Sequence, residues 1–174
     1  MFRRQSTALP IAYVVLRILV VLNWTVGACI LALLVFSFVN EPFLLKALKL
    51  GSVGENPELV YGIRSVAALG LVTIPINHAI LMRLLRMVET VGRGDPFVAD
   101  NAYRLNAIAW FLLALQLIGM VIGGIGEAIS TPQFPVELDA GFSVNGWLAV
   151  ILTFVLARVF AEGALMREDL EGTL

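Results

Sequence analysis

The stretch IAYVVLRILVVLNWTVGACILALLVFSFV, residues 11–39, decides the fold class of this chain. Its only charged side chain is Arg17, and it contains no proline. About 20 apolar residues in a helix are enough to cross the hydrocarbon core of a bilayer. Because backbone polar groups in lipid need internal partners, an isolated run of this kind must be helical. The run therefore predicts a transmembrane helix.

The composition of the whole chain points the same way. Of 174 residues, 59% are hydrophobic and 14% are charged, and the mean hydropathy is +0.90. Average soluble domains are about 25% charged. The net charge of −1 gives no electrostatic support for direct binding of nucleic acid. With only Cys29 and His78, the chain can form neither an internal disulfide, a Cys-rich metal site nor a bis-histidine haem site.

Three further apolar runs follow the first, and segments containing glycine and proline separate them. We expect transmembrane spans at about residues 11–39, 62–88, 103–127 and 142–166. No connecting segment is long enough for a second domain, so we expect a single membrane domain over residues 1–174. The predicted fold class is all-α, an integral membrane bundle of four transmembrane helices.

The distribution of Lys and Arg predicts the orientation of these spans. Cytoplasmic loops of membrane proteins carry an excess of positive residues near the span ends. With a cytoplasmic N-terminus, nine of the 12 Lys and Arg residues lie inside, and the three outside are Lys46, Lys49 and Arg64. We therefore predict that both termini are cytoplasmic.

The segment ETVGRGDPFVADNA, residues 89–102, connects the second and third spans and is here called the elbow. It lacks the Lys-Ser/Thr pair of a phosphate-binding P-loop. We predict a rigid cytoplasmic turn in which Phe97 is an aromatic anchor at interface depth. Its other signals are Gly92 or Gly94 to end one helix, Asp95-Pro96 to turn, and Asp100 or Asn101 to N-cap the next helix.

Ionisable and polar residues at membrane depth need a reason, because their burial in lipid is costly. Arg158 and Glu162 lie four residues apart on one face of a helix, so we expect them to pair. The pair fits a structural ion-pair cluster at the cytoplasmic mouth, and the alternative is a gate or a docking surface for a cytoplasmic partner. Asn77 and His78 follow Pro75, and they fit either helix packing or an intramembrane polar site.

The third span carries two glycines, Gly119 and Gly123, with the small-xxx-small spacing that lets helices approach closely. This spacing fits packing inside one bundle, and it also permits a homodimer.

Two segments resemble a known family. Gly94-Asp95-Pro96-Phe97, followed by Asn101 and Leu105 at the start of a span, resembles the signature of uncharacterised bacterial and archaeal membrane proteins, domain of unknown function 2975. The run RVFAEGALMREDL, residues 158–170, is similar to the ending of that family. The resemblance implies the plasma (inner) membrane of a prokaryote. Many family members are encoded beside a small helix-turn-helix regulator, which implies a DNA-binding partner by analogy.

Two functions agree with these observations. The first is a non-enzymatic sensory or regulatory module in the lipid bilayer that acts with a cytoplasmic helix-turn-helix partner. The alternative is a small transporter or channel subunit that works as a dimer and uses the polar site at Asn77 and His78. Because no nucleophile–base pair or metal motif is present, we expect no enzyme activity and no catalytic, cofactor-binding or metal-binding residues. The expected partner surface consists of Arg93, Asp95, Phe97, Arg158 and Glu162.

Overall fold

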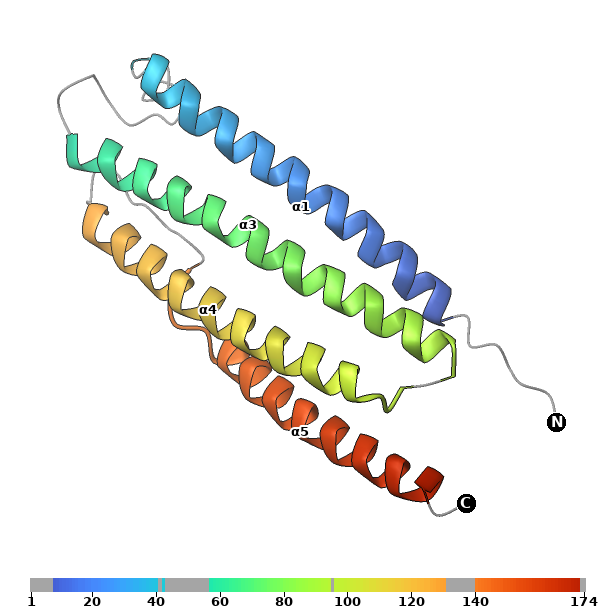
Figure 1. The fold of residues 1–174 in the computed structure, drawn as a ribbon. Helices are drawn as coiled ribbons and strands as arrows, with labels where there is room; N and C mark the ends of the chain where they lie inside the picture. The colour runs from blue at the N-terminus through green and yellow to red at the C-terminus, as the bar shows by residue number, and fades with distance from the viewer. Residues whose placement is uncertain (1–7, 41, 43–56, 95, 131–139, 173–174) are drawn as a thin grey trace. The chain divides into compact units, whose positions relative to one another are not determined.

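The computed structural model describes residues 8–40, 42, 57–94, 96–130 and 140–172. Within them lie four long helices, which are α1 (Ala8–Val39), α3 (Pro57–Gly92), α4 (Ala99–Ile129) and α5 (Val144–Gly172) (Figure 1). Each is long and apolar enough to cross a membrane. This confirms the predicted all-α class with four candidate spans, and the protein is a multi-pass membrane protein.

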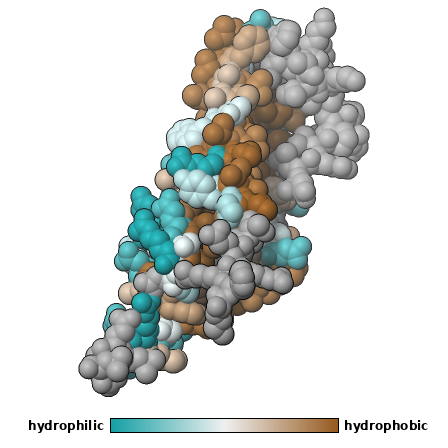
Figure 2. Space-filling view, turned by 90° about the vertical axis from the view of Figure 1, so that its right-hand side faces the viewer, coloured by the Kyte–Doolittle hydropathy of each residue, from teal (hydrophilic) through white to brown (hydrophobic). Residues whose placement is uncertain are grey.

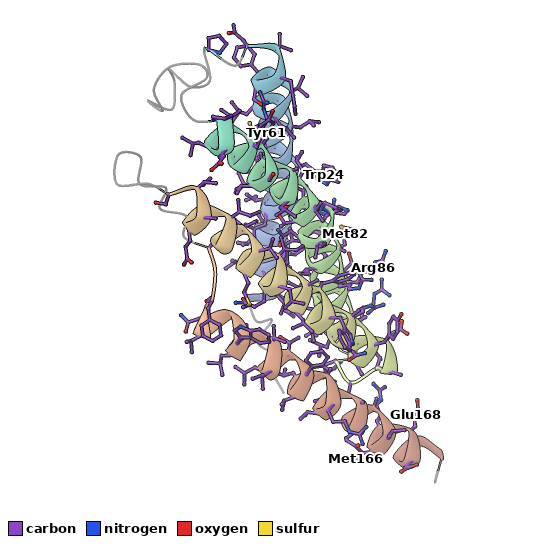
Figure 3. The ribbon with its side chains drawn as sticks, turned by 90° about the vertical axis from the view of Figure 1, so that its left-hand side faces the viewer. Trp24, Tyr61, Met82, Arg86, Met166 and Glu168 are labelled. Carbon is purple, nitrogen blue, oxygen red and sulfur yellow. The ribbon has the colours of Figure 1, made fainter. Side chains whose placement is uncertain are left out.

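Large apolar side chains are exposed on all four helices. Trp24, Tyr61 and Met166 are three examples, each more than half exposed (Figure 3). Hydrophobic residues cover much of the face in Figure 2. A surface of this kind is unfavourable in water but suits the hydrocarbon of a bilayer. The apolar residues that lie beyond the small core are therefore the lipid-facing part of the fold.

Three helices begin earlier than the expected spans, and α1 does so at Ala8, three residues before residue 11. Helix α3 starts at Pro57, five residues before the expected span, because proline suits the first helical turn and Glu58 complements the helix dipole there. Helix α4 starts at Ala99, so the expectation that Asp100 or Asn101 precedes the helix as its N-cap is wrong. Both residues lie inside the first turn, where the backbone N–H of Asn101 donates to the Val98 carbonyl at 2.9 Å.

The chain packs as two compact units; α1, α3 and α4 are each divided between them, and α5 lies in unit 1 except for its first residue. Unit 1 contains Met1–Asn23, Ile76–Leu113 and Asn145–Leu174, and unit 2 contains Trp24–Pro75 and Ala114–Val144. Most residues of the expected partner surface belong to unit 1. The unit also contains the elbow and nearly all of α5.

Close backbone contacts in unit 2 explain one of the conspicuous glycines of α4. A Cβ atom on Gly123 would lie 2.7 Å from the Cα of Gly141, which itself has a φ of +122°. Gly123 therefore packs against the chain's own backbone just before α5. A Cβ on Gly119 or Gly124 would meet nothing within 4 Å among the described residues. The two glycines of the predicted pair thus have different surroundings.

Candidate functional site

The elbow begins where α3 ends, and glycine makes this ending possible. The N–H of Gly94 donates to the Val91 carbonyl at 3.0 Å, and Gly94 has a φ of +90°. Only glycine adopts this conformation without a steric cost, so Gly94 rather than Gly92 takes the left-handed position at the helix end. Arg93 is exposed beside it. Asp95, the next residue of the expected partner surface, lies outside the described residues.

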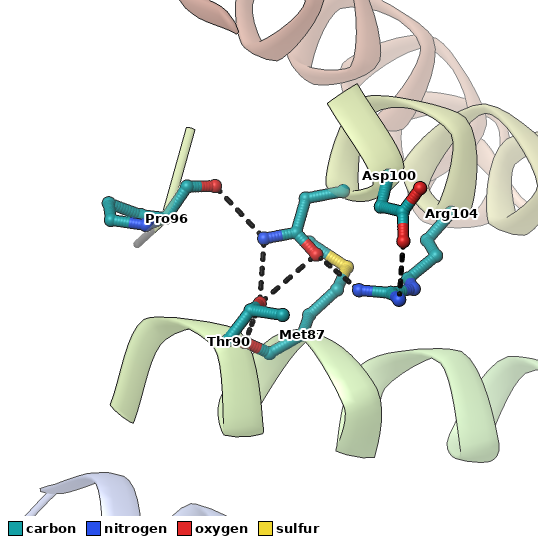
Figure 4. A network of polar contacts seen from close by, with 6 residues as sticks. Met87, Thr90, Pro96, Asp100 and Arg104 are labelled. Atoms are coloured by element: carbon teal, nitrogen blue, oxygen red, sulfur yellow. Dashed lines mark hydrogen bonds and ion pairs between the residues drawn. The ribbon is translucent and has the colours of Figure 1, made fainter. Parts of the chain in front are cut away.

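Asn101 is the buried centre of the elbow and is fully inaccessible to solvent. Its Nδ2 donates to Thr90 Oγ1 at 2.8 Å and to the Pro96 carbonyl at 2.9 Å (Figure 4). Its Oδ1 accepts from Arg104 Nη1 at 2.8 Å. The amide thus uses both donor hydrogens and its acceptor, as a buried polar side chain requires. One side chain therefore joins the end of α3, the turn and the first helical turn of α4.

Arg104 extends this network to the surface. Its Nη2 lies 3.1 Å from Asp100 Oδ2, so one guanidinium bridges two residues in the first turn of α4. The Arg104 side chain is 18% exposed, whereas that of Asp100 is 79% exposed. The Asp100 carboxylate also lies near the positive end of the α4 dipole. The burial of the Arg104 side chain and its ion pair with Asp100 therefore favour the same conformation of the elbow.

Phe97 joins the elbow to α5. Its ring lies 5.2 Å from that of Phe160, centroid to centroid, with a 41° angle between the planes. Gly163, one turn further, leaves room for the same ring, since a Cβ there would lie 2.8 Å from Phe97 Cδ1. Phe97 nevertheless remains 44% exposed. It is therefore a half-covered aromatic residue on the surface of unit 1.

The predicted pairing of Arg158 with Glu162 is confirmed. Arg158 Nη2 forms an ion pair with Glu162 Oε1 along α5, and the two side chains are 79% and 44% exposed. An exposed pair at this spacing contributes only about 0.3–0.5 kcal/mol to helix stability. The fold does not need the pair for its stability, and its charged groups remain accessible.

The structure therefore brings several of the expected surface residues onto two neighbouring segments. Phe97 contacts α5 at Phe160 and Gly163, and Glu162 directly precedes Gly163 in the helix. Arg93 is exposed at the end of α3, four residues before Phe97. The elbow and α5 are therefore in contact through Phe97 within unit 1, and the residues of these two segments are here called the patch.

Asn77 and His78 lie apart from this patch on α3, and both are half-buried. Helix α3 continues through Pro75 without interruption. The described residues contain no group of three or more His, Cys, Asp and Glu side chains that could hold a metal ion.

A polar site at the end of α1 was not predicted from the sequence. Arg64 of α3 donates from Nε to Ser37 Oγ at 3.0 Å and from Nη2 to the Ser37 carbonyl at 2.6 Å. Its guanidinium also lies 4.4 Å from the centre of the Phe38 ring. A cation that binds a carbonyl in the last turn of a helix favours that helix end. The available signal was an arginine inside a predicted span, but the sequence did not indicate its partner.

Comparison with known proteins identifies the family of this chain. The model of a family described as proteins of unknown function, DUF2975, matches residues 50–174, which include the elbow and all of α5. No match is found among curated proteins or among solved structures. Because the matched region is well over half of the sequence, the chain belongs to the DUF2975 family.

Proposed function

We propose that this protein is a non-enzymatic membrane module that binds a cytoplasmic regulatory protein through the patch formed by the elbow and α5. The observation that carries the proposal is the position of Phe97. It is held against Phe160 and Gly163 by packing, yet almost half of its surface remains free. Exposed Arg93 in the elbow and the Arg158–Glu162 pair on α5 provide charged groups on the same two segments.

This combination has the chemistry of a protein-binding surface. Binding hot spots are enriched in aromatic and arginine residues, and charged groups around them provide specificity more than affinity. Because the turn is held by the Asn101 network, Phe97 is presented without a large loss of conformational freedom on binding. By analogy with the family, the partner is a small helix-turn-helix protein.

The proposal requires the patch to face the cytoplasm, and the arginine distribution supports this. Among the described residues, unit 1 contains seven arginines and unit 2 contains only Arg64. The seven are Arg17, Arg83, Arg86, Arg93, Arg104, Arg158 and Arg167. The positive-inside rule then favours cytoplasmic termini in the inner membrane of a prokaryote. A cysteine introduced at Arg93 should react with a membrane-impermeant maleimide only after the cells are opened.

Co-purification tests the proposal directly. The tagged protein and the neighbouring regulator should be co-expressed and extracted in mild detergent. We expect the regulator to co-purify with the natural chain and to be reduced several-fold with Phe97→Ala. Phe142→Ala is the matched control, because Phe142 is an exposed aromatic residue in unit 2. Absence of the regulator from the natural complex, or an equal loss with both variants, would contradict the proposed surface.

The alternative, a small transporter or channel subunit working as a dimer, is favoured by the half-buried polar pair after Pro75. Proline leaves one carbonyl of the preceding turn without its helical N–H, which makes the helix locally polar. Ion flux in proteoliposomes tests this function. Equal flux for the natural chain and His78→Ala would remove His78 from any such path.

A further inference from the structure

A groove of about 430 Å³ lies in unit 1 between the first turns of α4 and the middle of α5. Small side chains, including Ala157 and Ala161, leave its floor open. Phe154 lines its other end and makes an edge-to-face contact with Trp110, with ring centroids 5.4 Å apart. The groove is therefore lined by small side chains at one end and by an aromatic ring at the other.

Three polar side chains line the same groove. They are Tyr103 and Asn106 of α4 and Arg158 of α5. Tyr103 and Asn106 are exposed, and neither side chain makes a hydrogen bond with any other described residue. The Asn106 amide and the Tyr103 hydroxyl can therefore donate hydrogen bonds to a ligand in the groove.

Arg158 gives the groove its charge. The lining contains this one cation and no carboxylate. The ion pair with Glu162 occupies Nη2, and a guanidinium has five N–H donors, so further donors remain for a second anion. The groove therefore combines a cation, an amide and a hydroxyl, which together suit a phosphate oxygen.

The depth of the groove favours a lipid as the source of that phosphate. Tyr103 and Asn106 lie in the first two turns of α4, beside the charged residues Asp100 and Arg104. A segment with this composition lies near the membrane–water interface, where phospholipid head groups are found. Trp110 lies one turn further along α4, and Phe154 of α5 packs against it. This aromatic end of the groove lies toward the hydrocarbon, where an acyl chain would run.

We propose that this groove binds an anionic glycerophospholipid, whose phosphate is held by Arg158 and Asn106 and whose acyl chain packs along Phe154 and Trp110. Tyr103 contacts the head group. A lipid with a net negative charge fits because the groove lining contains a cation and no acid; Glu162, which pairs with Arg158, is not one of the lining residues. The inference does not rest on the proposed regulatory function, although the two surfaces share Arg158.

Native mass spectrometry of the full chain in mild detergent, titrated with dioleoyl phosphatidylglycerol, tests the proposal. We expect Arg158→Gln and Asn106→Leu each to weaken lipid retention about tenfold, which is the effect of losing one hydrogen bond to a charged group. Ala157→Leu, which fills the groove without changing its charge, should also weaken it. Arg86→Gln removes an exposed arginine of unit 1 outside the groove and should leave retention unchanged. Circular dichroism should confirm unchanged helix content in each variant.

Other ligands separate the possible sources of phosphate. Dioleoyl phosphatidylethanolamine, dioleoyl phosphatidylcholine and inorganic phosphate should each bind at least several-fold more weakly. Equal retention of the zwitterionic lipids would overturn the anionic head group, and equal binding of inorganic phosphate would overturn the lipid. Retention that is unchanged in Asn106→Leu and Ala157→Leu, or a dimer that forms through this groove in place of lipid, would overturn the site itself. Phe97→Ala should leave lipid retention intact, so this result is independent of the regulator experiment.

Discussion

Replacement of Asn101 by leucine should open the elbow and lower the stability of unit 1. The side chain is completely buried and makes hydrogen bonds to Thr90, Pro96 and Arg104. Leucine is similar in length but makes none of these bonds. The Pro96 carbonyl loses the amide donor that it has in the natural chain. Among the described residues, Arg104 then keeps its ion pair with Asp100 and loses its bond to the amide oxygen.

The size of the effect follows from the kinds of bond that are lost. A neutral hydrogen bond contributes about 1 kcal/mol net, and a bond to a charged group contributes about 1.5–3 kcal/mol. Two neutral bonds and one charged bond are lost, so the free energy of unfolding should fall by about 3–5 kcal/mol. Asp100→Asn is the matched control, because it removes only an exposed ion pair and should cost about 0.5 kcal/mol or less.

Reversible unfolding in mixed detergent–dodecyl sulfate micelles, followed by circular dichroism, measures the free energy. Amide hydrogen exchange at residues 90–101 shows whether the loss is local to the elbow. Thr90→Val should be strongly coupled to Asn101→Leu, so the double variant should lose less stability than the two single variants together. A loss below about 1 kcal/mol in Asn101→Leu, with unchanged exchange in the elbow, would refute the interpretation of Asn101 as its centre.

Three other substitutions test contacts on which the fold depends. Gly123→Ala should destabilise unit 2 by about 1–3 kcal/mol, because the methyl group would overlap the backbone before α5; Gly119→Ala, where the space is open, should be neutral or stabilising in the same unfolding assay. Arg64→Leu should cost about 2–4 kcal/mol through the loss of both bonds to the end of α1, and a melting temperature equal to that of the natural chain would contradict this. Gly163→Leu should displace Phe97 from α5 and raise amide exchange in the elbow; unchanged exchange would show that the ring does not depend on this glycine.

The sequence predicts the helices well, because each depends on a local property. A run such as residues 11–39 has no stable state in lipid other than a helix, whatever the rest of the chain does. The Arg158–Glu162 pair is similarly predictable, since a spacing of four residues places both side chains on one face. The sequence also predicts that Gly92 or Gly94 ends α3, and the φ of +90° at Gly94 selects between the two.

The contacts that build the candidate site are not local, and for this reason they were missed. Asn101 satisfies the description of a helix cap by residue type, but its partner Thr90 lies 11 positions earlier, across a turn. Arg64 and Ser37 are 27 positions apart on different helices. Periodicity identifies which face of a helix is apolar, but it does not identify which residue of another helix lies opposite. To predict such pairs one must know the register between the helices, and the sequence pattern does not determine it.

The contact of Phe97 with α5 and the hydrogen bonds of Asn101 to α3 lie so close together in the elbow that a change in one should affect the other. Phe97 holds α5, and four residues later Asn101 holds α3 through Thr90. The carbonyl of Pro96, directly before Phe97, is itself bound by Asn101. A partner that drew Phe97 away from Phe160 would therefore displace the Pro96 carbonyl from the Asn101 amide. Because a buried amide without its acceptor is costly, the displacement would weaken the bond network to α3 as well. Binding at the surface of α5 would thus change the free energy of the α3–α4 connection, and the Asn101 network is the physical link between the two.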